Sequence, residues 1–234
     1  MNLKEIKQVI EDHKITLSIP KEKGSYPIYY LFANDYHDRE EIVSMLGDAG
    51  IILCFIEVSD WEGSMTPWPA ESLFKKAPDF LGEADRFIEE FQQVKDFVKA
   101  TLPEEIVISS SHVVGFSLSA IFSLYLVSRE EGFQSVVAIS PSAWYEGLFT
   151  YFRDHPMPSS LKAIYLSLGI EEADHSNEKI ASVEKRTLKL QELFQEQAMR
   201  VFLSCDQGDH YDLITERMVA GIQWSLLSSE MLDQ

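Results

Sequence analysis

Short apolar runs alternate along the chain with longer segments whose apolar residues recur at helical spacing. The runs at 15–19, 26–33, 51–58, 106–114, 135–140, 163–168 and 201–205 predict strands. Helical spacing predicts a short amphipathic helix over 4–13 and further helices near 40–46, 80–98, 121–127, 177–198 and 214–226. This alternation predicts an α/β fold, a mostly parallel central sheet with helices on both faces. No repeat or linker interrupts the pattern, so we expect one domain over 1–234.

Polar and aromatic loops follow several of the predicted strands. Residues 59–78 form the longest irregular stretch, and further loops are expected over 142–160, 169–176 and 206–210. Ligands of mostly parallel sheets bind at the carboxyl ends of the strands. We therefore expect the functional site where these loops meet.

The stretch Gly115-Phe116-Ser117-Leu118-Ser119 joins a predicted strand to an apolar helix. A strand that ends at a glycine, turns at a serine and continues as a buried helix is typical of the nucleophile elbow of serine hydrolases. The tight turn needs small residues two positions before and after the nucleophile. Gly115 meets this need fully, whereas Ser119 stands where a second glycine is usual. The turn also aims the helix N-terminus at Ser117, where free N–H groups favour developing negative charge.

A nucleophilic serine needs a base, and the base needs an acid that orients it. On a scaffold of this kind the three residues follow in the order serine, acid, histidine. His210 comes after a predicted strand and a glycine, so we expect it to be the base for Ser117. The acid is expected from the loop after 163–168, with Glu172 favoured and Glu171 and Asp174 as alternatives.

The oxyanion that forms in acyl transfer needs two backbone N–H donors. We expect one from Leu118, directly after the nucleophile, and the other from the loop after 26–33, with Asp35 favoured over Tyr36. Large aromatic side chains on loops around a site usually bind apolar or aromatic groups. The candidates for such pocket walls are Tyr36, Trp61, Trp144 and Tyr145. Trp68, held between two prolines, is expected to pack its own loop, and His37 to lie near the site.

Six segments carry a resemblance to a known family: Tyr29–Ala33, Thr66–Ala70 (Thr-Pro-Trp-Pro-Ala), Gly115–Ser119, Ser140–Tyr145 (Ser-Pro-Ser-Ala-Trp-Tyr), Leu166–Gly169 and Gly208–His210. With them the chain resembles the esterase family of α/β-hydrolases that includes esterase D-like and ferric enterobactin esterase-like enzymes. The resemblance covers most of the chain from Tyr26 onward. It implies an α/β-hydrolase fold and carboxylic-ester hydrolysis by Ser117 and His210, with an acid from the loop after Gly169. Members differ widely in substrate and include acyltransferases.

Charge and composition limit the classes of partner, cofactor and cellular location that we expect. Lys and Arg number 20 against 38 Asp and Glu, a net charge of −18. This balance argues against a nucleic-acid backbone or an anionic membrane surface as partner. Cys54 and Cys205 both lie in predicted strands, so we expect buried free thiols. No cysteine or histidine spacing indicates a metal, and no cofactor is expected. The N-terminus lacks an apolar signal core and no run is apolar enough to span a bilayer, so we expect a cytoplasmic protein.

These observations predict a serine carboxylic-ester hydrolase that acts on a small-molecule ester through an acyl-enzyme on Ser117, with His210 as base. An acyltransferase on the same scaffold and a catalytically silent binding protein are the alternatives. A homodimer is compatible with the sequence.

Overall fold

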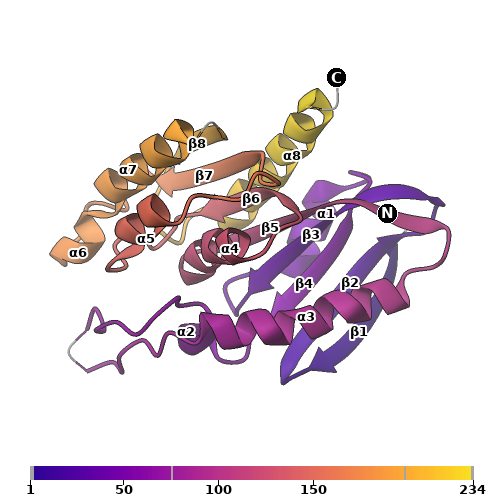
Figure 1. Ribbon diagram of the computed structural model, residues 1–234, viewed down its shortest axis with the longest axis horizontal. Helices are drawn as coiled ribbons and strands as arrows, with labels where there is room; N and C mark the ends of the chain where they lie inside the picture. The colour runs from indigo at the N-terminus through magenta and orange to yellow at the C-terminus, as the bar shows by residue number, and fades with distance from the viewer. Residues whose placement is uncertain (1–2, 75, 198, 233–234) are drawn as a thin grey trace.

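The residues described by the computed structural model, 3–74, 76–197 and 199–232, form one eight-stranded sheet flanked by helices (Figure 1). The strands are β1 (Leu3–Ile10), β2 (His13–Pro20), β3 (Gly24–Ala33), β4 (Ile52–Glu57), β5 (Ile106–Phe116), β6 (Phe133–Ile139), β7 (Ala163–Gly169) and β8 (Arg200–Asp206). Their order is β1-β2-β4-β3-β5-β6-β7-β8. β2 pairs antiparallel with β1 and β4, and every other pairing is parallel. The carboxyl ends of β3 to β8 therefore lie along one edge.

Helices cover both faces of this sheet. The larger core gathers buried side chains from α3 (Ala84–Thr101), α4 (Leu118–Arg129), α5 (Leu148–Asp154) and α7 (Val183–Glu196). The smaller core lies on the other face under α1 (Arg39–Leu46) and α8 (Ile214–Leu232). In Figure 1, α3 and α4 cross in front of the sheet and α8 runs behind it. Successive residues of β3 alternate between the two cores, as a strand buried on both faces requires. The predicted α/β architecture is confirmed.

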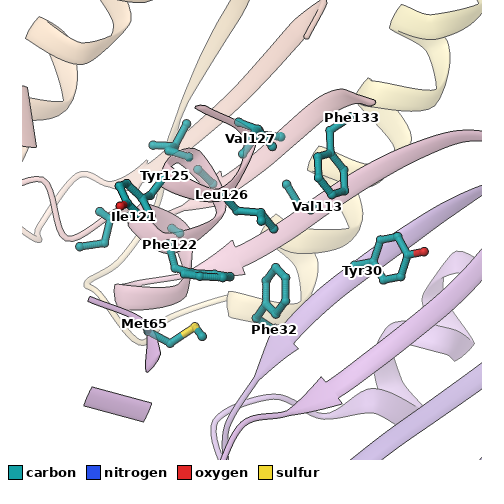
Figure 2. Close-up of a cluster of buried hydrophobic side chains, with 14 of the residues drawn as sticks. Tyr30, Phe32, Met65, Val113, Ile121, Phe122, Tyr125, Leu126, Val127 and Phe133 are labelled. Carbon is teal, nitrogen blue, oxygen red and sulfur yellow. The ribbon is translucent and has the colours of Figure 1, made fainter. Parts of the chain in front are cut away.

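Aromatic packing fixes α4 on the sheet. Phe32 of β3 is fully buried, and its ring centroid lies 4.9 Å from that of Phe122 on α4, at an interplanar angle of 89°. Figure 2 shows these two rings next to each other at a steep angle, with Met65 on the other side of Phe122. Edge-to-face pairs of this kind stabilise by about 0.5–1.5 kcal/mol beyond the area they bury. α4 lies over β5 and β6, and this contact ties it to β3 as well, at the point where the chain leaves β5.

The N-terminal prediction is wrong: residues 4–13 do not form a helix. Leu3–Ile10 is strand β1, paired antiparallel with β2 in the register Ile10↔His13. The intervening Glu11 and Asp12 both have positive φ, 45° and 67°, as a two-residue hairpin turn of this hand needs. Ile6 and Ile10 still pack against the larger core, from a strand instead of a helix.

Four smaller expectations also differ from the structure. The loop expected over 142–160 contains α5, and α2 (Trp61–Ser64) interrupts 59–78. The helix expected over 177–198 is two helices, α6 (Glu178–Ala181) and α7, which meet at Ser182, while Ala198 lies outside the described residues. Cys54 is a buried free thiol as expected, but Cys205 is exposed. Cys205 lies near the end of β8, which is an edge strand.

Candidate active site

The turn between β5 and α4 has the geometry of a nucleophile elbow. Ser117 has φ 59° and ψ −116°, a conformation that L residues rarely adopt. Its N–H donates to the Ile139 carbonyl of β6 at 3.0 Å. A Cβ added to Gly115 would lie 2.1 Å from the Ser119 carbonyl oxygen, so only glycine fits at position 115. The elbow therefore depends on a close approach between the end of β5 and the first turn of α4.

Ser119, where a glycine is usual, makes hydrogen bonds that a glycine could not make. Its side chain is fully buried, and its Oγ accepts the N–H of Phe116 at 2.9 Å. The same hydroxyl lies 3.1 Å from the Phe32 carbonyl, to which it can donate. A glycine would leave the Phe116 N–H without this partner. The hydroxyl thus ties the elbow to β3.

A chain of hydrogen bonds links three segments at this edge of the sheet. His210 Nε2 lies 3.0 Å from Ser117 Oγ, and His210 Nδ1 lies 2.8 Å from Glu172 Oε2. His210 belongs to the loop after β8 and Glu172 to the loop after β7. Of the three candidate acids, the structure brings Glu172 to the histidine, while Glu171 and Asp174 are exposed. A carboxylate that accepts from Nδ1–H leaves Nε2 free to accept the serine proton.

The two oxygens of the Glu172 carboxylate have different contacts: Oε1 is held by the surrounding structure, and Oε2 faces His210. Oε1 accepts the Gly169 N–H at 2.7 Å and the Ser140 hydroxyl at 2.5 Å. Burial raises the pKa of Glu172, but the hydrogen bond and charge of His210, with the hydrogen bonds from Ser140 and Gly169, outweigh it and lower the pKa below its ordinary value. The carboxyl is therefore ionised at neutral pH.

The two expected oxyanion donors border the same cavity as Ser117. Leu118 is the first residue of α4, so its N–H has no acceptor within the helix. Among the described residues, the N–H of Asp35 also makes no hydrogen bond to the protein. The alternative donor, Tyr36 N–H, is already bonded to Asn34 Oδ1 at 3.1 Å. The geometry thus favours Leu118 and Asp35.

His37 closes the loop that carries Asp35. Its Nδ1 lies 3.1 Å from the Asn34 N and 2.9 Å from Asn34 Oδ1, and its ring packs against Phe116 of the elbow with centroids 5.7 Å apart. Burial lowers the pKa of His37 to about 4, so the ring is neutral near pH 7. The loop is therefore closed by a neutral ring beside the elbow.

A cavity of about 700 Å³ opens in front of Ser117. Three of the four aromatic residues predicted as pocket walls border it, namely Tyr36, Trp61 and Trp144. Sequence reasoning missed four further aromatic side chains of its lining: Phe74, Phe80, Phe116 and Tyr211. Tyr36 and Tyr211 are both more than half exposed, and their ring centroids lie 5.2 Å apart. A second cavity, of about 600 Å³, borders β2, β4 and α1 and contains none of the predicted site residues.

The prediction for Tyr145 is wrong. Its side chain is fully buried, does not border the cavity, and donates its hydroxyl to the Trp68 carbonyl. Burial raises the pKa of Tyr145 to about 12. Trp68 does not border the cavity, but instead of packing only its own loop its ring packs against Tyr125 and Tyr151, and its Nε1 donates to the Glu146 carbonyl at 2.9 Å. The two residues join the loop before α3 to the loop after β6, behind the pocket wall.

Sequence reasoning also missed Ser140 and Arg217. Ser140 follows β6, has φ 42°, and contacts Glu172. Arg217 lies in the first turn of α8, 2 % exposed, with Nη2 3.4 Å from Glu172 Oε1. The available signal was its position beside Ile214 and Met218, which the sequence predicts to face inward.

In the part of the chain described, no group of three or more His, Cys, Asp or Glu side chains is placed to hold a metal ion. No described helix combines the length and the apolar character needed to cross a bilayer.

Comparisons with known proteins find relatives of this fold. No protein-family model matches the chain. It is 21% identical over 230 residues to the uncharacterized protein YbbA of Bacillus subtilis (strain 168), covering 91% of this chain and 92% of that protein.

Several solved structures superpose on most of the chain. The siderophore hydrolase EstA from Aspergillus nidulans superposes with a TM-score of 0.73 at 18% identity, covering 95% of this chain and 93% of that one. An IroE-like serine hydrolase from Shewanella oneidensis gives 0.78 at 13% identity, over 94% and 79% of the two chains. An S-formylglutathione hydrolase from Agrobacterium tumefaciens gives 0.62 at 12% identity, over 95% and 92%. The sheet order, the two helical layers and these superpositions establish that the chain has the α/β-hydrolase fold.

Proposed function

We propose that this protein is a serine carboxylic-ester hydrolase that works through an acyl-enzyme on Ser117. The observation that carries the proposal is the hydrogen-bond chain from Ser117 Oγ through His210 to Glu172, with distances of 3.0 and 2.8 Å. The names of the solved structures it resembles, siderophore hydrolases and a serine hydrolase among them, support the same reaction class.

In the acylation step, His210 Nε2 takes the proton of Ser117 as the Oγ electron pair attacks the ester carbonyl carbon. The carbonyl oxygen becomes an oxyanion held by the N–H groups of Leu118 and Asp35 and by the N-terminus of α4. When the tetrahedral intermediate collapses, the C–O bond to the alcohol breaks and His210 gives its proton to the departing oxygen. Glu172 stabilises the imidazolium meanwhile. Water then attacks the acyl-enzyme by the same route and releases the acid and the free serine.

The cavity supports a substrate with an apolar or aromatic part. Rings of Trp61, Trp144 and Phe80 border the space next to Ser117, and the volume of about 700 Å³ suits a small-molecule ester. The site needs no cofactor for the steps above.

Ser117→Ala tests the proposal directly. We expect turnover of p-nitrophenyl acetate to fall by about 10⁶-fold in kcat. Ser128→Ala is the matched control, because Ser128 lies on the same helix and its hydroxyl donates to the Tyr125 carbonyl. Retained turnover in a folded Ser117→Ala protein would contradict the proposal.

The same chemistry allows an alcohol in place of water as the acceptor. Product analysis with a competing alcohol separates the two outcomes, because an acyltransferase forms mostly the new ester. A catalytically silent binding protein would give no covalent adduct on Ser117 with a fluorophosphonate probe, whereas a hydrolase or acyltransferase would.

A further inference from the structure

A single buried cation lies behind the predicted acid and touches the ends of three strands. Arg217 is 2 % exposed, and its Nε donates to Ser167 Oγ of β7 at 2.7 Å. Its Nη2 donates to Ser140 Oγ after β6 and lies 3.4 Å from Glu172 Oε1. Its Nε also lies 3.5 Å from Asp206 Oδ2 at the end of β8. Arg217 thus connects the segments that carry the acid and the histidine.

The contacts of Glu172 are divided between its two oxygens. Oε1 contacts Ser140, Gly169 and Arg217, whereas His210 is the one partner of Oε2 among the described residues. This division fixes the rotation of the carboxylate about its last bond, so that one oxygen always faces the imidazole. The Ser140 hydroxyl stands between the guanidinium and Oε1, accepting from the first and donating to the second. Ser140 holds φ at 42° to reach this position.

Asp206 holds the same guanidinium from the strand that leads to the histidine loop. Ser167 Oγ donates to Asp206 Oδ2 at 2.6 Å while it accepts from Arg217 Nε. Ser204 Oγ donates to Asp206 Oδ1 at 2.9 Å. One cation therefore faces two carboxylates, and the geometry of each depends on the guanidinium having several donors in one plane.

A buried ion pair with hydrogen bonds of this kind is weak evidence for stability, because the cost of removing both charges from water offsets their attraction. Here the ion pair matters because it fixes the position of Glu172. We propose that Arg217 is a positioning residue for the ester hydrolysis proposed above: acting through Ser140 and Oε1, it holds Glu172 so that Oε2 accepts the Nδ1–H of His210. The inference rests on the proposed function and adds a residue to it.

Arg217→Lys is the first test, because an ammonium keeps the charge but cannot reach Ser140 and Ser167 together. We expect kcat for p-nitrophenyl acetate to fall by about 10²-fold, as a misplaced group remote from the reacting atoms can cost, with KM almost unchanged. Arg153→Lys is the matched control, because Arg153 is exposed and its ion pair is with its neighbour Asp154. The kcat is taken per folded protein, measured by far-ultraviolet circular dichroism.

A double-mutant cycle with Glu172→Gln separates positioning from general loss of structure. If Arg217 acts through Glu172, Arg217→Lys has little further effect on kcat once the carboxylate is gone. Equal falls of kcat in both backgrounds, or an unchanged kcat in the wild-type background, would overturn the inference. If Arg217→Lys does not fold, Ser140→Ala decides, with an expected fall of about 10-fold that also vanishes in the Glu172→Gln background.

The failure of this inference is distinguishable from failure of the proposed function. If Ser117→Ala abolishes turnover but Arg217→Lys and Ser140→Ala keep the wild-type kcat, the hydrolase assignment stands and only the role of Arg217 is rejected. If Ser117→Ala keeps its turnover, the reaction itself is assigned wrongly.

Discussion

The two halves of the candidate site are built in different ways. The nucleophile side, around Ser117, is formed by neighbours in sequence: Gly115 and Ser119 lie two residues away and make the turn. The acid side is formed by segments far apart, because Glu172 is held by Ser140, 32 residues earlier, and by Arg217, 45 residues later. The first half depends on backbone conformation, and the second on a buried polar network. Local patterns therefore reveal the first half and leave most of the second hidden.

Of the variants that compare the two halves, the one that removes the acid should lower kcat the most. Glu172→Gln keeps the size of the side chain but weakens the orientation of His210 and the stabilisation of its charged form. We expect kcat to fall by about 10⁴-fold, the cost of the equivalent change in serine proteases. Glu171→Gln, at the exposed neighbouring position, is the control and should keep the wild-type kcat. The measurement is steady-state hydrolysis of p-nitrophenyl acetate, and a fall in both variants alike would mean that the loop, and not Glu172, is what matters.

This contrast also decides what the sequence could predict. Each of Glu171, Glu172 and Asp174 follows β7 closely enough to be the acid, and the sequence carries no sign of which one meets Gly169 N–H, Ser140 and Arg217. The turn at Ser117, by contrast, needs only a small residue at each flank, which the sequence displays directly. Long-range polar contacts depend on the register of several strands at once, and no local spacing encodes that register.

The fold divides in the same way. The buried parallel strands and the amphipathic helices are recognisable because burial imposes a period on the sequence. Leu3, Ile6 and Ile10 fit a helix as well as a strand, and the hairpin that decides between them turns at Glu11 and Asp12, without the Asn-Gly pair that usually marks such a turn. Trp144 and Tyr145 are adjacent in the same loop, and the sequence does not distinguish them. Tyr145 lies inward because its ring packs against Trp68 and its hydroxyl donates to the Trp68 carbonyl.

The next largest effect should come from the oxyanion loop, which is distant from Ser117 in sequence but borders the same cavity. Asp35→Pro removes the backbone N–H proposed to hold the oxyanion, and loss of one such donor lowers kcat by about 10²–10³-fold. Asp35→Asn keeps the N–H and is the control, with a kcat expected near that of the wild type. If the two variants have the same kcat, the second donor is not Asp35.

Ser119 tests how firmly the elbow is tied to the sheet. Ser119→Ala leaves the buried Phe116 N–H without its acceptor, which should lower the free energy of unfolding by about 1–3 kcal/mol. Ser123→Ala is a suitable control, because Ser123 is equally buried on the same helix and its hydroxyl only donates to the Ser119 carbonyl. Urea denaturation followed by tryptophan fluorescence measures both. A larger loss in Ser123→Ala would mean that the Ser119 hydroxyl does not anchor the elbow.

The smallest expected effect concerns the pH dependence of stability, which should differ between the two halves of the site. Near the elbow, burial lowers the pKa of His37, which packs against Phe116, and of His112 on β5 from 6.5 to about 4. The unfolded chain therefore binds protons that the folded protein refuses as pH falls from 6.5 towards 4, and stability decreases across that window. On the acid side, the pKa of Glu172 lies below its ordinary 4.5, so the stability it contributes is complete above that pH and is lost only below it.

These windows predict opposite behaviour in two variants. His112→Gln should reduce the loss of stability between pH 6.5 and 4.5 and keep the loss at lower pH. Glu172→Gln should keep the part of the upper loss that His37 and His112 produce and flatten the dependence below pH 4.5. Urea midpoints collected at a series of pH values measure both. A Glu172→Gln protein that loses the dependence above pH 4.5 would mean that the acid network and the elbow titrate as one unit. The half built by neighbouring residues and the half built by distant ones would then not contribute separately to the free energy of unfolding.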